Sequence, residues 1–562
     1  MSILTVVTLK LRDLRRKASE EVTIPFPNPE TTPPETIINF MLYYCITYSG
    51  DFNMNKRFFL ASLTILLLSF CLKVIPTLNN NFYFTMDQGR DAVYAREIIN
   101  RQQIILEGPE TSGIKGFFTG PFWYYFISIG YFLFHSHPFG AVFMLTLLNT
   151  IVTGILMWWL AKRVSPTIAL LTGFSLQFFW PMYDSSRYGF NPFLLVPLSI
   201  LLILLLTDSL QEKKYSFLLA SVPVGLAFHS EVAGATVFLF SYFLTGIFLA
   251  IRRKISLKTI FLSILLLSLF FLPHLISEVN TGFSQTRALL QETKTSQSVF
   301  SGTNFRFITQ KFLELLKESI IPQSVLLSLI FLVAITPFFV RSCHKRIFTY
   351  HFSLITFCLW LLSWLWFSSN KGWQTWHTIY LPPLLFISIL LTLFTLPRKT
   401  GVIFFSIIFL SQAATFKSQY SKYIYPSDDP SLLKNELAAI DWVYQKSGGK
   451  GFYVYTYLPS VLDYPYQYLF WWYGRKKYSY LPCEFASYPG SPKLFIPGSE
   501  YYENPKRQCA NLRFLIIEPD KNLTVQGEWR KNITADTRLI EETKVGKIAL
   551  EMRQVENLGK NK

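Results

Sequence analysis

The stretch from Lys56 to Asp91 decides the fold. It begins with KRFFLASLTILLLSFCLKVI (residues 56–75), a basic pair followed by an almost uncharged run, and ends with MDQGRD (residues 86–91). A helix of about 20 apolar residues is long enough to cross a bilayer. The run therefore predicts a membrane span. The motif behind it places two carboxylates and a guanidinium where lipid ends and water begins.

The rest of the chain repeats this apolar character. Of its 562 residues 51% are hydrophobic and 17% are aromatic, and further long runs such as Phe193–Leu206 and Ile260–Leu272 are nearly uncharged. We therefore predict a polytopic α-helical membrane protein with one polar domain attached. The formal net charge of +18 comes in clusters at the ends of apolar runs, which is typical of short cytoplasmic loops. We therefore expect membrane lipids, and no nucleic acid, as partners.

The distribution of basic residues predicts a topology. The pair Lys56-Arg57 and five later clusters, at 162–163, 213–214, 252–254, 341–346 and 398–399, all fall on the cytoplasmic side if the chain crosses the membrane about eleven times. The expected spans are residues 58–77, 141–161, 166–182, 191–207, 215–229, 232–251, 257–276, 321–340, 349–367, 377–396 and 400–416. This topology places the C-terminal domain outside the cytoplasm.

The apolar run 121–134 is too short to be a span in this scheme. A helix of that length rises only about 21 Å, against a hydrocarbon core of about 30 Å, and its many aromatic side chains favour the membrane interface. We interpret it as a helix lying on the outer surface. The alternative, a twelfth span, would place Lys162-Arg163 outside. The turn Phe228-His229-Ser230-Glu231 is expected to divide residues 217–251 into two short helices.

On this topology the side chains that could carry chemistry face outward. The outer segments are residues 78–140 (the first outer loop), 183–190, 229–231, 277–320, 368–376 and 417–562. Their notable residues are Asp87, Arg90, Asp91, Lys115, Asp184, Arg187, His229, Glu231, Glu278, Arg287 and His377. A solvated or structural role is the alternative for each of them, because polar residues gather in loops.

The acidic motif is the most suggestive of these groups. If MDQGRD is helical, Asp87 and Asp91 share one face at i, i+4 spacing. Two carboxylates repel there unless a cation, a proton or a substrate hydroxyl lies between them, so the pair can tune a general base or hold a metal ion such as Mg²⁺ or Mn²⁺. A capping aspartate with an ion-paired neighbour is the alternative. Arg187, at the end of a span, could bind a lipid phosphate or anchor its helix.

The motifs of soluble nucleotide-dependent enzymes are missing from the sequence. It has no Gly-x-Gly-x-x-Gly opening a helix, no Walker loop and no His-Glu-x-x-His. We therefore do not expect ATP-driven chemistry. An activated donor would have to reach the site through the membrane.

Residues 417–562 lack long apolar runs and form the expected polar domain. Residues 432–446 have helical spacing of apolar positions, and 451–457 and 513–518 read as strands, which predicts a small α/β domain. Cys483 and Cys509 could form a disulfide there if the domain is extracytoplasmic, and a reduced pair is the alternative. The Tyr and Trp residues between 453 and 480 either stack on sugar rings or form a core.

The first 53 residues differ from the rest. A basic stretch at 12–16 and a proline-rich one at 25–34 are typical of disorder, and Met54-Asn-Lys-Arg before an apolar run looks like a natural start. We expect residues 1–53 to be disordered or a spurious upstream extension. The membrane domain would then cover residues 54–416.

The order of the motifs resembles the GT-C membrane glycosyltransferases, in particular the family 39-like group of protein O-mannosyltransferases and the lipid A aminoarabinose transferase. The pieces that carry the resemblance are Asp87–Asp91, Gly-Pro-Glu-Thr-Ser (108–112), Thr-Gly-Pro-Phe-Trp-Tyr-Tyr (119–125), Lys162-Arg163, Pro-Met-Tyr-Asp-Ser-Ser-Arg-Tyr (181–188), Pro-His-Leu-Ile-Ser-Glu (273–278), Trp-His-Thr-Ile-Tyr-Leu-Pro-Pro (376–383) and Tyr-Leu-Phe-Trp-Trp-Tyr-Gly (468–474). Together they cover roughly residues 54–480.

The resemblance implies a GT-C fold and a sugar donor on polyprenyl phosphate. The sugar would be transferred at the extracytoplasmic face of a plasma or inner membrane to a hydroxyl of a protein, lipid or glycan, usually with inversion. The family's first outer loop carries the essential acid, and Asp87 best matches it, with Asp91 second. Asp87 is then the base that deprotonates or orients the acceptor hydroxyl.

The donor phosphate needs cations, and here the sequence departs from the family. The family's His/Lys-Pro-Pro motif reads Thr119-Gly120-Pro121 in this chain, so its basic residue is missing. The candidates for the phosphate and substrate contacts are Arg90, Lys115, Arg187, His229, Glu231, Glu278 and His377.

Two other functions stay open. A transporter or flippase of lipid-linked sugars would favour inverted repeats and charged mid-span positions. The sequence has no clear repeat, and its ionisable residues gather on one face. A ligase of lipid-linked polymers shares the topology. In a ligase, Arg or His groups of a large outer loop would be the main functional residues, and Asp87 would be dispensable.

Overall fold

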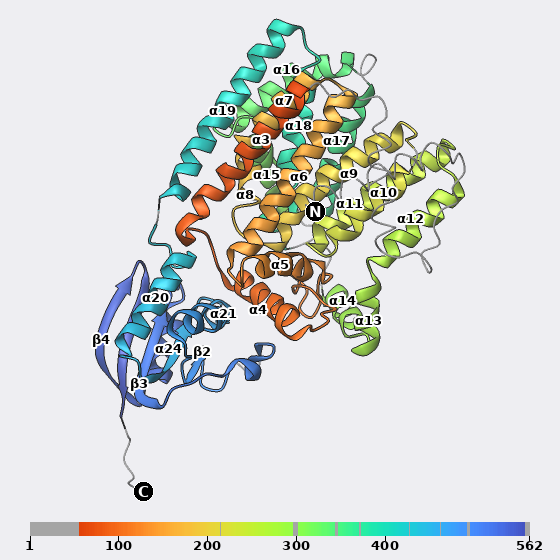
Figure 1. The fold of residues 1–562 in the computed structure, drawn as a ribbon. Coiled ribbons are helices and arrows are strands. Elements are labelled where there is room, and N and C mark those ends of the chain that lie inside the picture. Colours follow the sequence, from red (N-terminus) through yellow and green to blue (C-terminus); the bar gives the residue numbers. More distant parts are fainter. Residues whose placement is uncertain are drawn as a thin grey trace, which may run out of the picture. The chain divides into compact units, whose positions relative to one another are not determined.

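The computed structural model (Figure 1) describes residues 56–213, 215–295, 302–342, 347–369, 372–425, 427–460, 462–491 and 495–556. Residues 60–562 form one compact unit, and residues 1–59 belong to a second unit of which only 56–59 are described. The expectation for residues 1–53 lies outside the described residues.

Within the described residues, helices carry the apolar runs that were expected to span the membrane. In chain order they are α3 (Lys56–Val74), η1 (Ile75–Asn80), α4 (Met86–Arg101), α5 (Phe122–Leu133), α6 (Phe139–Arg163), α7 (Pro166–Gln177), α8 (Trp180–Asp184), η2 (Asn191–Leu194), α9 (Leu195–Leu210), α10 (Ser216–Ala227), α11 (Val232–Ile251), α12 (Leu257–Leu269), α13 (Leu272–Asn280), α14 (Ser284–Thr295), α15 (Gly302–Ser319), α16 (Val325–Ser342), α17 (Ile347–Ser369), η3 (Thr375–Thr378), α18 (Leu381–Leu393) and α19 (Arg398–Ile424). Each span expected from the sequence coincides with one or two of these helices.

Among the described residues, 7 helices are long and apolar enough to cross a membrane, or 8 if the bent pair α12–α13 is one span. The seven are α3 with η1, α6, η2 with α9, α11, α17, η3 with α18, and α19. The other three expected spans fall on α7 and α10, with 12 residues each, and on α16, which contains Pro337. The polytopic helical architecture is confirmed, and the number of crossings stays a prediction.

Two local predictions are confirmed as well. The run 121–134 forms the short helix α5, with 12 residues, although its place at the membrane interface stays a prediction. Helix α10 ends at Ala227 and α11 begins at Val232, so the turn between them divides the long apolar stretch as expected.

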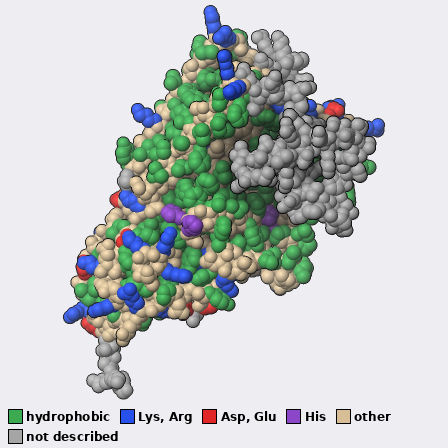
Figure 2. Space-filling model, in the orientation of Figure 1, with side chains coloured by type: hydrophobic (Ala, Val, Ile, Leu, Met, Phe, Trp, Pro, Cys, Tyr) green, Lys and Arg blue, Asp and Glu red, His purple; other side chains and the backbone are tan. Residues whose placement is uncertain are grey.

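The helical core is built around α9 and α18. Figure 1 shows α6, α9 and α17 side by side, and α18 packs against α15 and α17. Of the apolar windows in α9 and α18, 78% and 83% of the residues are buried, against 17% in both α3 and α19. Figure 2 shows apolar side chains over the described face that holds α3 and α19. Such an exposed apolar surface fits contact with lipid.

Helix α4 begins at the acidic motif and has a well-defined start. Thr85 is the N-cap, and a capping box with Gln88 closes the first turn. Just before it, residues 82–84 pair in extended fashion with residues 431–433, far along the chain. The Phe84 N–H donates to the Ser431 carbonyl at 2.9 Å, and the Leu433 N–H to the Phe82 carbonyl at 3.0 Å. The start of α4 is therefore fixed by the segment that opens the C-terminal domain.

The C-terminal domain is a mixed five-stranded sheet with helices on both faces, as the predicted small α/β domain requires. Its elements are α20 (Leu433–Lys446), β1 (Gly451–Tyr457), α21 (Tyr464–Leu469), η4 (Phe470–Gly474), α22 (Arg475–Tyr478), β2 (Glu484–Ala486), η5 (Ser499–Tyr502), β3 (Cys509–Ile517), α24 (Leu523–Thr534), β4 (Thr537–Val545) and β5 (Ile548–Val555). The strand order is β2-β1-β3-β5-β4, with β1 parallel to β2 and β3 and the other pairs antiparallel.

Alternate residues of the central strands point to opposite faces of this sheet. On one face Tyr457 packs against Trp529 of α24. On the other, Phe514 packs against Trp442 of α20. Cys483 and Cys509 form a disulfide, so of the two alternatives left by the sequence the paired one holds. Most of the aromatic residues between 453 and 480 are buried, which favours the core role over sugar stacking.

The C-terminal domain also holds α4 directly. Gly89 of α4 lies against the backbone of Tyr464 and Pro465 at the start of α21. A Cβ at position 89 would come within 2.3 Å of the Pro465 nitrogen. Only a residue without a side chain permits this approach, so the glycine inside the acidic motif sets the distance between the two helices.

A buried arginine makes the second contact between α4 and the C-terminal domain. Arg96 is 3% exposed, and its guanidinium lies 5.3 Å from the ring centroid of Trp471 and 3.9 Å from that of Tyr502. It also donates to the Pro497 carbonyl at 2.9 Å and pairs with Glu97 at 3.0 Å. Helix α4 is thus in contact with the C-terminal domain at both Gly89 and Arg96.

Candidate active site

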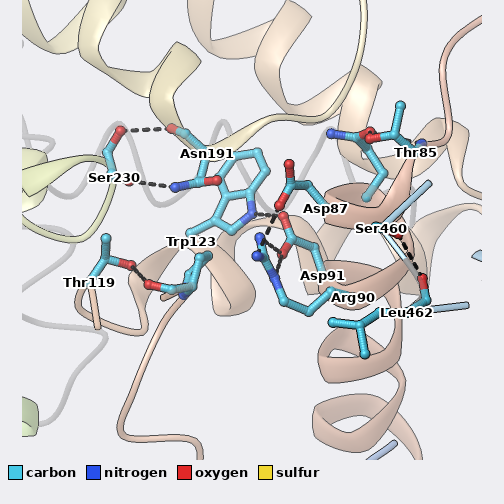
Figure 3. Close-up of polar contacts among 12 residues, drawn as sticks. Thr85, Asp87, Arg90, Asp91, Thr119, Trp123, Asn191, Ser230, Ser460 and Leu462 are labelled. Atoms are coloured by element: carbon cyan, nitrogen blue, oxygen red, sulfur yellow. Dashed lines mark hydrogen bonds and ion pairs between the residues drawn. The ribbon is translucent and has the colours of Figure 1, made fainter. Parts of the chain in front are cut away.

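The acidic motif forms a compact ion cluster on one face of α4 (Figure 3), as its i, i+4 spacing predicted. Arg90 lies between the two carboxylates. Its Nη1 is 3.0 Å from Asp87 Oδ1, and its Nη2 is 2.8 Å from Asp91 Oδ1. A single guanidinium therefore neutralises much of the repulsion between the two aspartates.

Asp91 is the buried member of the pair. Its other oxygen accepts a hydrogen bond from the indole N–H of Trp123 in α5, at 2.6 Å, and its side chain is only 2% exposed. Burial raises the pKa of Asp91 to about 6; the charge of Arg90 and the bonds from Arg90 and Trp123 lower this pKa, while Asp87 raises it. With both oxygens engaged, Asp91 joins α4 to α5.

Asp87 is the solvent-exposed aspartate of the pair. Its side chain is 37% exposed, and Arg90 is the one ion-pair partner that the described residues give it within 4 Å. A general base must reach the proton that it removes from a substrate. Of the two carboxylates, Asp87 has the accessibility that this role needs.

Replacing Trp123 by Phe is expected to lower stability, and more so at high pH. The indole bond stabilises the charged form of Asp91, so its loss should cost about 1.5–3 kcal/mol where Asp91 is ionised. Because the pKa of Asp91 is about 6 in the folded protein, the loss should be larger at pH 8 than at pH 5. Thermal unfolding in detergent at the two pH values measures this. Trp158→Phe, at a residue 45% exposed on α6, is the matched control, and equal losses at both pH values would contradict the role given to Trp123.

Arg187 lies in an aromatic box close to the ion cluster. Its guanidinium pairs with Asp184 and lies 4.9, 4.8 and 4.4 Å from the ring centroids of Tyr83, Tyr188 and Tyr423. Burial raises the pKa of Tyr188, Arg187 lowers it, and the charges of Asp184 and Asp87 raise it further. Tyr83 lies just before the start of α4, so the structure brings Arg187 near that end of the helix that carries Asp87.

His229 has a structural environment. Its Nδ1 accepts from the Phe122 N–H at 3.1 Å, and its Nε2 lies 2.8 Å from the Phe270 carbonyl oxygen, to which it must donate. Burial lowers the pKa of His229 to about 4, which keeps the ring neutral. Both nitrogens bind the protein, so His229 connects α5, the turn after α10 and the end of α12. Its substrate contact stays a prediction.

Glu231 and His377 form a second group. Glu231 caps α11 by accepting from the Ala233 and Gly234 N–H groups at 3.2 and 2.7 Å. The Nε2 atom of His377 lies 3.5 Å from Glu231 and 3.1 Å from the Ser112 hydroxyl, and its Nδ1 accepts from the backbone of residue 374. This group ties the first loop to η3. Ser230, just before Glu231, exchanges two hydrogen bonds with Asn191 at the start of η2 (Figure 3). The Asn191 amide nitrogen donates to the Ser230 carbonyl at 2.6 Å, and the Ser230 hydroxyl donates to the Asn191 carbonyl at 2.7 Å.

The remaining candidates lie apart from the ion cluster. Glu278 accepts from the Gln285 and Thr286 N–H groups at 2.9 and 3.0 Å and so fixes the start of α14. Lys115 and Arg287 are exposed.

The position of the missing basic residue is occupied by a structural threonine. Thr119 is 2% exposed, and its hydroxyl donates to the Pro109 carbonyl at 3.2 Å; Figure 3 shows this bond on the loop before Trp123. A basic side chain at position 119 would lose this hydrogen bond and would have to fit into a buried position. This position therefore offers no cation for the phosphate contact that the resemblance implies.

A divalent cation between the two aspartates would compete with Arg90. The guanidinium already occupies the space between Asp87 and Asp91, and within the described residues no three His, Cys, Asp or Glu side chains are grouped to hold a metal ion. These residues do not fit a metal without moving Arg90.

Two cavities flank α15 and were not found from the sequence. The polar cavity, of about 460 Å³, is lined by one face of α15 and by Asp184, Tyr188, Trp373 and Trp376. The apolar cavity, of about 560 Å³, is lined by the other face of α15 together with α16, α17 and α18. Helix α15 thus lies between the polar cavity, which is lined by Tyr188, and the apolar cavity, which is lined by the candidate spans α17 and α18.

Comparison with known proteins supports this architecture. The chain is similar to the crystal structure of ArnT from Cupriavidus metallidurans bound to undecaprenyl phosphate, with a TM-score of 0.53, 13% identity, and coverage of 90% of this chain and 98% of that one. The apo ArnT structure gives a TM-score of 0.52 at 13% identity, covering 88% and 97%. The archaeal oligosaccharyltransferase AglB from Archaeoglobus fulgidus scores 0.41 at 12% identity, covering 81% and 69%. No curated protein matches the chain.

The fold is therefore that of the GT-C membrane glycosyltransferases, and the resemblance stated from the motifs is confirmed. Within it, residues 119–276 match the model of the dolichyl-phosphate-mannose-protein mannosyltransferase family. The matched stretch includes Trp123, Arg187 and His229, while α4 and the polar face of α15 lie outside it.

Proposed function

We propose that this protein is a membrane glycosyltransferase that moves a sugar from a polyprenyl-phosphate donor to an acceptor hydroxyl, with Asp87 as the general base. The reaction would take place at the extracytoplasmic face, because the topology predicted from the basic clusters would put α4 and the C-terminal domain there. The acceptor is a protein, a lipid or a glycan.

The proposed reaction needs one base and one anion site. The acceptor oxygen attacks the anomeric carbon and gives its proton to Asp87. The bond between that carbon and the phosphate oxygen breaks, and the polyprenyl phosphate leaves as a stable anion, so no acid is needed on that side. Cations near the phosphate would stabilise the transition state. Arg90 keeps Asp87 oriented, and Arg187 lies beside Tyr188.

The two cavities on either side of α15 are the observation that carries this proposal. A lipid-linked donor has a charged head and a hydrocarbon chain, and it needs a polar and an apolar space next to one another. The polar cavity is lined by Tyr188 and Asp184, which lie beside Arg187. The apolar cavity is lined by residues of α17 and α18, both of which are candidate spans.

The test is transfer from a panel of polyprenyl-phosphate sugars by the purified protein in lipid nanodiscs, with and without a chelator. Transfer from at least one donor would support the proposal, and unchanged transfer with chelator would show that the reaction needs no divalent metal ion. Saturable binding of the donors without any transfer would overturn it in favour of a transporter or ligase.

A further inference from the structure

Three of the residues that the sequence singled out for the phosphate contact, Arg90, Arg187 and His377, are already engaged within the protein, and a fourth, Lys115, is exposed. Arg90 is shared by two carboxylates, Arg187 is paired with Asp184, and His377 accepts a backbone hydrogen bond that leaves it one N–H. A phosphate brought to this region would have to share each of them with an existing partner. The cation that the Thr119 position lacks is therefore not replaced by these residues alone.

Helix α15 supplies a cation that sequence reasoning missed. Lys311, Glu314, Lys317 and Glu318 all line the polar cavity beside Tyr188. Lys311 pairs with Glu314 at 2.9 Å, and Asp184, on the opposite wall, is paired with Arg187. Within the described part of the chain, Lys317 has no carboxylate within 4 Å. Its half-buried ammonium is the unpaired positive charge of the cavity.

The acid next to it, Glu318, is a weak competitor for this charge. Desolvation raises the pKa of Glu318 to about 7, Lys317 lowers it, and the carboxylates of Asp184 and Glu314 raise it further. Near neutral pH the residue is then only about half ionised. An unpaired ammonium next to a partly neutral acid favours an anionic ligand, because the anion would gain a charge-assisted contact that no carboxylate within 4 Å already makes among the described residues.

The cavity also holds polar atoms that the protein leaves without partners. Gln412 is 1% exposed, and its amide nitrogen donates to carbonyls of residues 318 and 320, but its Oε1 accepts nothing. The indole N–H of Trp373 is buried and has no acceptor either. Both residues line the cavity. A ligand with hydroxyls as well as negative charge, such as a sugar phosphate, could supply a donor and an acceptor together.

From these observations we infer that the polar cavity between α15 and Tyr188 binds the phosphate-sugar head of the donor, and that Lys317 makes the cationic contact with the phosphate. The inference rests on the proposed function, and it names the site of the head group within it. Lys317 replaces, from a different element, the basic residue that the first loop lacks at Thr119.

The experiment measures binding rather than turnover. Wild-type protein in nanodiscs is titrated with undecaprenyl phosphate and, separately, with undecaprenol, the uncharged alcohol of the same chain. We expect wild type to prefer the phosphate, and Lys317→Gln to weaken phosphate binding by about ten- to a hundredfold without changing undecaprenol binding. Lys317→Arg should restore most of the affinity. Lys521→Gln, at an exposed site of the C-terminal domain, is the control and should bind like wild type.

The outcomes separate this inference from the proposed function. A wild-type preference for the phosphate that survives in Lys317→Gln would overturn the role of Lys317 and leave the glycosyltransferase standing. No preference in wild type would count against both. Competition by phosphatidylglycerol at equal concentration would assign the site to a membrane lipid head group instead and so overturn the donor assignment. The melting temperatures of the variants must match wild type, because Lys317 lies in the last turn of α15 and could also stabilise that helix end.

Discussion

Asp87→Asn is expected to lower the rate of sugar transfer by about 10²–10⁴-fold, the usual contribution of a positioned general base. Asparagine keeps the size of the side chain and cannot take up the acceptor proton. Donor binding should change little, because the variant leaves the cavity lining intact. The measurement is the initial rate under saturating donor, with wild type and variant compared in the same nanodiscs.

The matched control is Asp428→Asn, which alters a carboxylate 62% exposed beside Lys547, far from α4 in the sequence. It should retain wild-type rates and a wild-type melting temperature. Full activity of a correctly folded Asp87→Asn protein would contradict the role of Asp87 as general base. It would favour the ligase alternative, in which this acid is dispensable.

Arg96→Ala should be the most destabilising single change at the contact between α4 and the C-terminal domain. Arg96 is 3% exposed and pairs with Glu97, which is fully buried. Removing one partner of a buried ion pair costs up to about 3–5 kcal/mol, and Glu97 would keep only the partly exposed Arg101 as a partner. The rings of Trp471 and Tyr502 would also lose the guanidinium packed between them. Thermal unfolding, with limited proteolysis of the 495–502 segment, reports both effects.

Arg101→Ala is the control for that experiment. Arg101 pairs with the same Glu97 at 2.8 Å but is 31% exposed, so its loss should lower the melting temperature far less. Arg96→Lys keeps the charge without the flat guanidinium and should fall between the two. Equal effects of Arg96→Ala and Arg101→Ala would mean that the buried position of Arg96 has no special importance.

Much of the fold could be predicted because it follows from local pattern. The apolar runs predicted the helices, and the turn at residues 228–231 was found because a polar tetrapeptide interrupts an otherwise continuous apolar stretch. The strands at 451–457 and 513–518 were predicted from their β-branched and aromatic residues. The i, i+4 spacing likewise placed Asp87 and Asp91 on one face of α4.

The details of the site could not be predicted, because they depend on contacts between distant segments. Nothing local indicates that Trp123 donates to Asp91, or that the ring of His229 has both nitrogens bonded within the protein. The polar face of α15 is a different case. Lys311, Glu314 and Lys317 recur at helical spacing in the sequence, so an amphipathic reading of residues 302–319 would have found them.

The pairing of residues 82–84 with residues 431–433 has a consequence for how the protein matures. Ribosomes release the chain from its N-terminus, and the first span and α4 leave the ribosome long before the C-terminal domain exists. Until that domain folds, α4 lacks the backbone partners at its start, the close contact at Gly89 and the contact between Arg96 and the ring of Tyr502. We therefore expect the nascent protein to insert into the membrane as an inactive precursor. Helix α4, with its proposed base Asp87, would become aligned only once the last quarter of the polypeptide has been made and folded.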